Sequence, residues 1–168
     1  MDDQISHPVL QDMTLKSKSK DDGKLVYRFT SNEQTLNLES RALPREAAIK
    51  YMDDRFIIFE SMFKEHPSAY PGLITQSVKC TSEYRPVGHR LETDEIIARG
   101  FDLFSNDRMV YGTCSATEVA YRSFYAMIYC LQQGQLYEIR FFTNKGSAAM
   151  GEDFLKRFTC TTNASSKQ

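Results

Sequence analysis

The segment Val119–Phe158 constrains the fold of this chain more than any other part of the sequence. Residues 119–131 are almost continuously apolar or aromatic, which predicts a long strand with apolar side chains on both faces. Residues 132–135 contain a glycine and predict a turn, and residues 136–142 predict the returning strand. A helix is expected to follow. The segment therefore predicts an antiparallel sheet with a terminal helix folded across it.

Two helices are predicted from apolar side chains that recur every three to four residues. The C-terminal helix is expected at about residues 147–159, with Ser147 as its N-cap. Its apolar residues are Met150, Phe154 and Phe158. A longer helix is expected at about residues 44–66, because Pro44 suits the first helical position and Pro67 ends the pattern. Its apolar stripe consists of Ile49, Met52, Phe56, Phe59 and Phe63.

Strands are predicted on both sides of the long helix. Asp22 and Gly23 form a strong hairpin signal between strands at residues 13–19 and 25–31, since glycine tolerates the positive φ that such turns require. Alternation of apolar and polar residues predicts a third strand at residues 35–40. After the long helix, further strands are expected at residues 72–81, 91–104 and 108–114, the last two separated by a turn.

The predicted fold class is α+β, with an antiparallel sheet of about six to eight strands and the two helices segregated from it. A chain of 168 residues can bury a core as one domain. We expect that domain over residues 13–160. Residues 1–12 and the small, polar residues 161–168 are expected to form a flexible N-terminus and a flexible tail.

Charge and hydropathy exclude several classes of partner. The formal net charge is −1, from 21 basic and 22 acidic residues, so no nucleic acid partner is expected. No apolar run approaches the roughly 20 residues that span a bilayer, so no transmembrane segment is expected. Residues 1–4 do not resemble an export signal. Removal of a signal would leave the same beginning, so periplasmic or other export and a cytoplasmic location both stay open.

Four cysteines leave the redox state of the chain open. Their spacings of 34, 16 and 30 residues do not suggest a zinc site. Two disulfides in any of three connectivities would require an oxidising compartment. Alternatively, the thiols are reduced and act as small apolar side chains. The cysteines are Cys80, Cys114, Cys130 and Cys160.

The sequence contains no catalytic or metal-binding signature. Residues 146–151 have the glycine spacing of a phosphate-binding loop, but Glu152 and Asp153 follow in place of the lysine and hydroxyl residue, and their charge repels phosphate. Three histidines are expected in the loose N-terminus, at a helix end and in a loop; they are His7, His66 and His89. We therefore expect no cofactor, no metal and no catalytic residue. The basic loop 85–90 is either solvated or a local edge that contacts an anion.

The strand at residues 119–131 carries the candidate binding residues. Alternation places three tyrosines on one face, and Phe124 and Ile128 on the other. One face is expected to meet the helices, and the other is either covered by the chain or forms a groove. Tyrosine combines an apolar ring with a polar tip and is favoured at binding surfaces. The candidate partner-binding residues are Tyr121, Tyr125 and Tyr129, extended by Tyr137 and Arg140 on the next strand.

The same region resembles PsbP-like domains, which share their fold with Mog-type Ran-binding proteins. The resemblance covers about a quarter of the chain, at residues 119–158, and consists of an aromatic strand, a turn with glycine, the returning strand and the final helix. The matching residues are Arg122, Phe124, Tyr125, Gly134, Leu136, Tyr137, Ile139, Phe154, Leu155 and Phe158. It implies a PsbP/Mog-like sandwich.

Two functional hypotheses follow, from different classes. The resemblance implies a non-catalytic accessory or protein-interaction module, which would bind a protein partner through the tyrosine-rich face or an adjoining groove. The alternative is a small-molecule or lipid-binding pocket protein with a curved sheet, similar to the ketosteroid-isomerase cone, with or without catalysis. That alternative requires an enclosed cavity that holds Asp, Glu or His with a perturbed pKa.

Overall fold

The computed structural model describes residues 5–65, 87–104, 121–147 and 151–160. This part of the chain is α+β and mostly sheet, as predicted, with a seven-stranded antiparallel sheet, a two-stranded sheet and three helices. In chain order the elements are β1 (Ile5–Ser6), α1 (Pro8–Gln11), β2 (Thr14–Asp21), β3 (Lys24–Thr30), β4 (Gln34–Ala42), α2 (Arg45–Glu65), β5 (Val87–Glu92), β6 (Ile96–Phe104), β7 (Tyr121–Cys130), β8 (Gln135–Ser147), α3 (Gly151–Arg157) and β9 (Thr159–Cys160).

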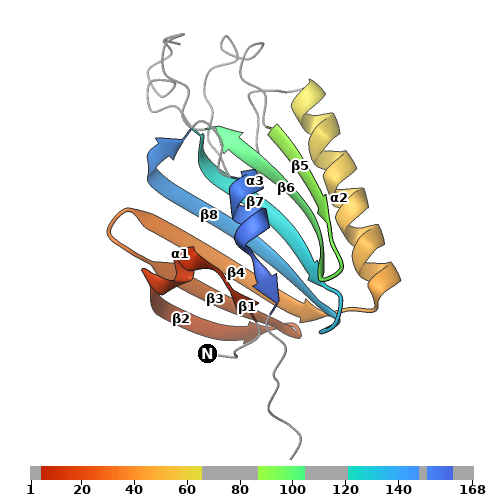
Figure 1. Cartoon of the computed structure of the whole chain (residues 1–168), viewed down its shortest axis with the longest axis horizontal. Helices are drawn as coiled ribbons and strands as arrows, with labels where there is room; N and C mark the ends of the chain where they lie inside the picture. Colours follow the sequence, from red (N-terminus) through yellow and green to blue (C-terminus); the bar gives the residue numbers. More distant parts are fainter. Residues whose placement is uncertain (1–4, 66–86, 105–120, 148–150, 161–168) are drawn as a thin grey trace, which may run out of the picture.

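The large sheet has the strand order β2-β3-β4-β8-β7-β6-β5 (Figure 1). The β2–β3 hairpin turns at Asp22 and Gly23, whose φ angles of 43° and 76° confirm the predicted turn. Strand β4 pairs with β8 along its whole length, from Gln34 opposite Thr143 to Ala42 opposite Gln135. This long-range pairing joins the N-terminal strands to the C-terminal ones in a single sheet.

Helices cover both faces of the sheet, so the core has two layers. On one face, α2 packs Ala48, Met52, Phe56 and Phe59 against the side chains of β6, β7 and β8. On the other face, α3 contributes Phe154 and Leu155, and crosses in front of the sheet in Figure 1. Residues that alternate along β7 therefore enter different layers, as the sequence predicts. The prediction that only one face meets the helices is wrong.

The N-terminal segment, expected to be flexible through residue 12, forms two short elements. Strand β1 pairs with β9, with Ile5 opposite Cys160 and Ser6 opposite Thr159. Helix α1 follows, and Val9 and Leu10 pack against the core on the α3 face. Tertiary contacts hold this segment in place, and it forms no long amphipathic element. The sequence therefore shows no periodic pattern here from which the order could be predicted. The predicted flexible tail at residues 161–168 lies outside the described residues.

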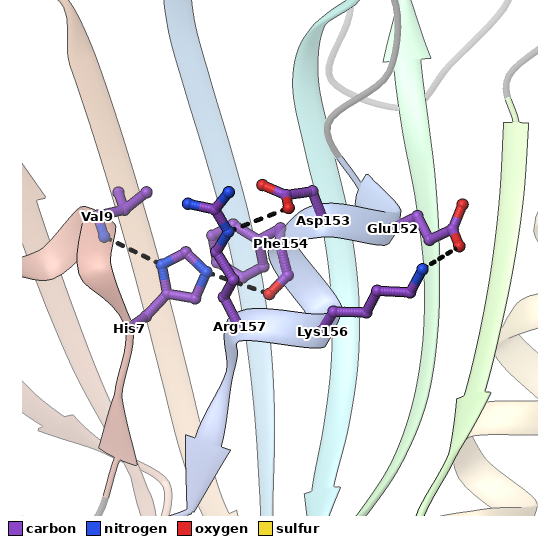
Figure 2. A network of polar contacts seen from close by, with 7 residues as sticks. All are labelled: His7, Val9, Glu152, Asp153, Phe154, Lys156 and Arg157. Carbon is purple, nitrogen blue, oxygen red and sulfur yellow. Dashed lines mark hydrogen bonds and ion pairs between the residues drawn. The ribbon is translucent and has the colours of Figure 1, made fainter.

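His7 anchors this N-terminal segment to α3 (Figure 2). The side chain is buried, with its ring stacked on Phe154 at a centroid distance of 4.0 Å. Its Nδ1 accepts a hydrogen bond from the Val9 N–H at 3.1 Å, which caps α1, so the proton of the neutral ring resides on Nε2. Nε2 then donates to the carbonyl oxygen of Phe154 at 3.1 Å. Both ring nitrogens are therefore satisfied only in the neutral form.

We predict that the free energy of unfolding falls as the pH is lowered below about 6.5, and that His7 causes part of this loss. Burial lowers the pKa of His7 from its ordinary value of 6.5, so the unfolded chain binds more protons in this range than the folded chain. Protonation of Nδ1 also removes the acceptor for Val9. Urea unfolding of the wild type and of His7→Gln, at about pH 7.5 and about pH 5.5, measures the effect. An equal loss between the two pH values in both proteins would contradict this assignment.

The sequence prediction differs from the structure at three further places. Residues 91–104, predicted as one strand, contain the end of β5, a turn and β6. The turn depends on Thr93, whose Oγ1 accepts hydrogen bonds from the N–H groups of Glu95 and Ile96, a local signal that was not recognised. Ser147 ends β8 and is not the N-cap of α3. The strands predicted at residues 72–81 and 108–114 lie outside the described residues.

Candidate functional site

Two of the tyrosines that were predicted to bind a partner, Tyr125 and Tyr129, belong to the core. Tyr125 and Tyr129 are each 2% exposed beneath α2. The Tyr125 ring packs edge-on against Phe59 at 5.3 Å, and the Tyr129 hydroxyl donates to the carbonyl oxygen of Leu43 at 2.9 Å. A partner could reach these rings only after α2 had moved away from the sheet. The structure therefore does not present them as an open groove.

Of the predicted binding residues on β8, Arg140 shares the sheet face of Tyr125, whereas Tyr137 lies on the other face. Tyr137 is 3% exposed and lies in the opposite layer, where its ring approaches Phe158 at 6.0 Å. Arg140 lies opposite Tyr125 in the β7–β8 pairing and is exposed to solvent. Tyr121 begins β7, but its side chain is not among those described. Tyr137 and Arg140 fall on different faces because their positions differ by three, an odd number, on a strand of period two.

A carboxylate organises the polar contacts beneath α2. The Oε1 atom of Glu138 accepts hydrogen bonds from the Tyr51 hydroxyl at 2.9 Å and from Nη2 of Arg41 at 3.1 Å. Its Oε2 atom accepts one from the Tyr125 hydroxyl at 3.0 Å. Burial and the nearby Glu138 charge raise the pKa values of Tyr51 and Tyr125. Both phenols therefore stay protonated and donate, and the cluster fastens α2 to β4, β7 and β8.

A second cluster, around a buried arginine, joins α2 to the β5–β6 edge of the sheet. Arg99 of β6 is 4% exposed, yet its guanidinium has three acceptors within hydrogen-bonding distance. Nε donates to Asp53 at 2.9 Å, Nη2 to Glu92 at 2.7 Å, and Nη1 to the Ala98 carbonyl oxygen at 2.9 Å. Asp53 of α2 therefore has a structural partner on the sheet. Neither of these clusters offers an open site.

The outward surface of α2 carries two adjacent apolar side chains, Ile57 and Ile58, which we call the α2 patch. They are 58% and 54% exposed. At 3.6 residues per turn they lie about 100° and 200° around the helix from Phe56, which is buried against the sheet. The polar residues on the same surface include Lys50 and Asp54, which form an ion pair with each other at 2.6 Å. The patch was not predicted from the sequence, because the periodic apolar stripe of α2 indicates only the side of the helix that is buried.

A pocket lies where the edge strand β5 meets α3, and we call it the β5–α3 pocket. Its volume is about 260 Å³. The residues that line it are Gly88, His89, Arg90, Leu91, Glu152, Leu155 and Lys156. His89 lies in a strand and not in the predicted loop. Residues 88–90, part of the basic segment noted in the sequence, thus contribute to a concave surface.

His89, which lines the β5–α3 pocket, pairs with Asp102. Nε2 of His89 lies 2.7 Å from Oδ2 of Asp102, and Asp102 is fully buried. The Oδ1 atom of Asp102 accepts a hydrogen bond from the Gly151 N–H at 2.8 Å. Three elements, β5, β6 and α3, are joined by these two contacts. The sequence placed the His and the Asp 13 residues apart and showed no motif that links them.

Only glycine fits at the start of α3. A Cβ atom on Gly151 would lie 2.6 Å from Cε2 of Phe124 and 2.7 Å from Cδ2 of His89. Both distances are shorter than van der Waals contact, so a larger residue would displace α3 or the His89 ring. The close approach lets the Gly151 N–H reach Asp102 and holds one edge of the imidazole against the backbone of α3. The position of the His89 ring is therefore set by packing against the start of α3.

The charged rim of the pocket belongs to α3. Lys156 and Glu152 pair along the helix at 2.6 Å, and their side chains are 61% and 67% exposed (Figure 2). The hydrogen bond and charge of Lys156 lower the pKa of Glu152, and Glu152 in turn raises the pKa of Lys156. An exposed pair of this kind contributes little to stability, so Lys156 can exchange Glu152 for another anion at small cost.

The described residues include a disulfide. Cys130 and Cys160 form a disulfide that ties β7 to β9, one of the pairings left open by the sequence. Cys80 and Cys114 lie outside the described residues.

No group of three or more potential metal ligands occurs among the residues that the structure describes. Within the same residues, none of the helices is long and apolar enough to cross a membrane.

Comparison with known proteins does not assign the chain to a family. No family model, curated protein or solved structure matches it significantly. The features that bear on function are therefore those of the structure itself: the α2 patch, the β5–α3 pocket and the buried Tyr125 and Tyr129.

Proposed function

We propose that this protein is a non-catalytic accessory module of PsbP-like type that binds a protein partner through the α2 patch. The exposure of Ile57 and Ile58, at 58% and 54%, is the observation that carries the proposal. Exposed apolar side chains are common singly, but neighbours on one helix surface provide an apolar anchor for a partner. The helix–sheet–helix layering supports a PsbP/Mog-like sandwich, in which α2 is an outer layer.

The chemistry around the α2 patch favours a protein over a charged ligand. Lys50 and Asp54 neutralise each other beside it, so the surface has no local excess of charge from this pair. Interface cores are depleted in charged residues and enriched in apolar ones, and a charged rim surrounds them. The expected occupant is a partner protein that presents apolar side chains in a locally neutral surface.

The structure gives less support to a pocket protein with a curved, hollow sheet. The sheet face that would line such a cavity is filled by α2, whose Met52 is 0% and Phe56 is 2% exposed. On the other face Phe154 and Leu155 fill the corresponding layer. The β5–α3 pocket is a depression at the sheet edge and does not lie within the sheet.

Site-specific photo-crosslinking can identify the partner. A photoreactive amino acid is placed at position 58 in the native host, and at position 15 as a matched control. Leu15 is also an exposed apolar residue, at 41%, but it lies on the edge strand β2. We expect one protein to be captured from position 58 and not from position 15. Capture of a second copy of this chain, or of no protein, would overturn the proposal.

Affinity measurements with the purified partner then test the role of the patch. The double variant Ile57→Gln/Ile58→Gln removes the apolar surface and keeps good helix formers. We expect it to weaken binding by about tenfold or more, since central apolar anchors dominate interface energies, and to leave the unfolding midpoint unchanged. Leu15→Gln should bind like the wild type. Equal weakening by both variants would show that the α2 patch has no special role.

A further inference from the structure

We propose that the sheet face beside α2 carries a binding site for an acidic protein segment, centred on Arg28 of β3 and Arg140 of β8. The two arginines flank Asn37 of β4 in one row across three strands, and we call these three residues the arginine row. Their guanidinium groups would donate hydrogen bonds to two carboxylates of the segment. The site is separate from the α2 patch, and its test does not depend on the partner proposed there.

The strand register places the three side chains on one open face of the sheet. Arg28 lies opposite Asn37 in the β3–β4 pairing, and Asn37 lies opposite Arg140 in the β4–β8 pairing. Since neighbouring strands lie about 4.8 Å apart, the Cα atoms of the two arginines are about 10 Å apart. Helix α2 packs on this face over β6 and β7, at the β5 side of the sheet in Figure 1. Beyond the helix, Arg28 and Arg140 are both exposed.

The arginine row has a positive charge that its acidic neighbours do not neutralise. Glu39 and Glu138 lie opposite each other in the adjacent row, and each pairs with another cation: Glu39 with Lys24 at 3.8 Å, and Glu138 with Arg41 at 3.1 Å. Within the described part of the chain, no acidic group pairs with either arginine of the row. The two ion pairs cancel, so the row leaves an excess of two positive charges, on groups that do not deprotonate in proteins. Arg55 of α2, whose charge interacts with Glu138, adds a third at the border of the helix.

The residues on either side of the arginine row favour a protein segment over a nucleic acid. Single-stranded nucleic acids are bound by a basic groove that follows the phosphates and by several aromatic side chains that stack on the bases. Here Glu39 and Glu138 border the row on one side, so a continuous line of phosphates would approach carboxylates. Thr30, Thr35 and Phe142 border it on the other side, and Phe142 is 38% exposed. An acidic polypeptide provides separate carboxylates for the two arginines and an apolar side chain for Phe142.

Nuclear magnetic resonance titration of the full chain tests the site directly. The probe is the acetylated and amidated peptide Glu-Ser-Glu-Leu-Glu, whose glutamates lie on one side of an extended chain. Saturable shifts are expected for the Nε–H signals of Arg28 and Arg140 and for the backbone amides of Asn37 and Phe142. The same peptide with glutamine in place of glutamate should bind at least about tenfold more weakly, because it offers no charged acceptor. Added salt should also weaken binding of the acidic peptide, since exposed charges are screened.

Matched variants assign the binding to the arginine row. Arg28→Gln and Arg140→Gln should each weaken binding of the acidic peptide by about fivefold, as expected for an exposed charge pair, and the double variant should weaken it more than either. Both positions are exposed, so the unfolding midpoint should stay that of the wild type. Arg157→Gln is the control and should bind like the wild type. Arg157 is also exposed, at 58%, but it belongs to α3 on the opposite face of the sheet.

Four results would overturn the proposal. The first is the absence of saturable shifts of the two arginine Nε–H signals with the acidic peptide. The second is equal binding of the glutamine peptide, or equal weakening by Arg157→Gln, either of which would show that the charge of the row is irrelevant. The third is tighter binding of hexathymidylate, titrated under the same conditions, which would assign the face to single-stranded nucleic acid. The fourth is a concentration-dependent shift of the same signals without peptide, which would make a second copy of the chain the occupant.

Discussion

Replacement of Tyr125 by alanine is expected to lower the free energy of unfolding by about 3–5 kcal/mol, the range for truncation of a buried aromatic side chain. The ring is 2% exposed and packs against Phe59, so its removal leaves a cavity between α2 and β7. The hydroxyl also donates to Glu138, which would lose one of its three donors. Urea unfolding followed by circular dichroism measures the difference.

Tyr125→Phe separates the ring from the hydroxyl. It keeps the packing and removes only the hydrogen bond to Glu138, so we expect a loss of about 1.5–3 kcal/mol, as for hydrogen bonds to charged groups. The phenylalanine variant should still bind the partner, because Tyr125 lies beneath α2. Unchanged stability of Tyr125→Ala, together with a selective loss of binding, would show that the tyrosine is a contact residue and that α2 does not cover it in solution.

Loss of the Cys130–Cys160 disulfide is expected to have the second largest effect. The bond closes a loop with a sequence separation of 30 residues, for which the chain-entropy relation gives about 3–4 kcal/mol. Cys160→Ser removes it at the partly buried end and leaves Cys130 as a buried thiol. We expect the C-terminal strand β9 to separate from β1, and α1 to lose part of its anchoring.

Two measurements check the disulfide. Peptide mapping without reduction should recover the two cysteines in one linked fragment, and urea unfolding of Cys160→Ser should show the expected loss. A reductant should destabilise Cys160→Ser less than it destabilises the wild type, because this bond is already absent. Alkylation of Cys130 in the unreduced, denatured wild type would contradict the assignment.

Local patterns were sufficient to predict β7 and its two layers. Alternation along the strand predicted that Phe124 and Ile128 lie on one face of the sheet and Tyr125 and Tyr129 on the other. The structure places the two pairs in different layers of the core. The sequence did not reveal that α2 covers the tyrosine face. That packing joins residues far apart in the sequence, such as Phe59 and Tyr125, which are 66 positions apart. Periodicity within one element carries no information on which face of a sheet it will occupy.

The β5–α3 pocket could not be predicted because the turn before β6 was missed. Once Thr93 is recognised as a turn residue, the β5–β6 register places His89 opposite Gly100 and Val87 opposite Asp102. His89 and Asp102 are then diagonal neighbours on one face of the sheet, within reach of each other. The contribution of Gly151 comes from tertiary packing and has no local signal in the sequence.

The central claim is that a partner binds the outward surface of α2 while the tyrosine face remains core. Amide hydrogen exchange of the purified chain, with and without the partner captured from position 58, tests this claim most directly. We predict added protection in the half of α2 that contains Ile57 and Ile58, and unchanged exchange in β7 and β8. Protection confined to the lysine-bearing edge strand β2, or faster exchange in β7 and β8 as α2 separates from the sheet, would contradict it.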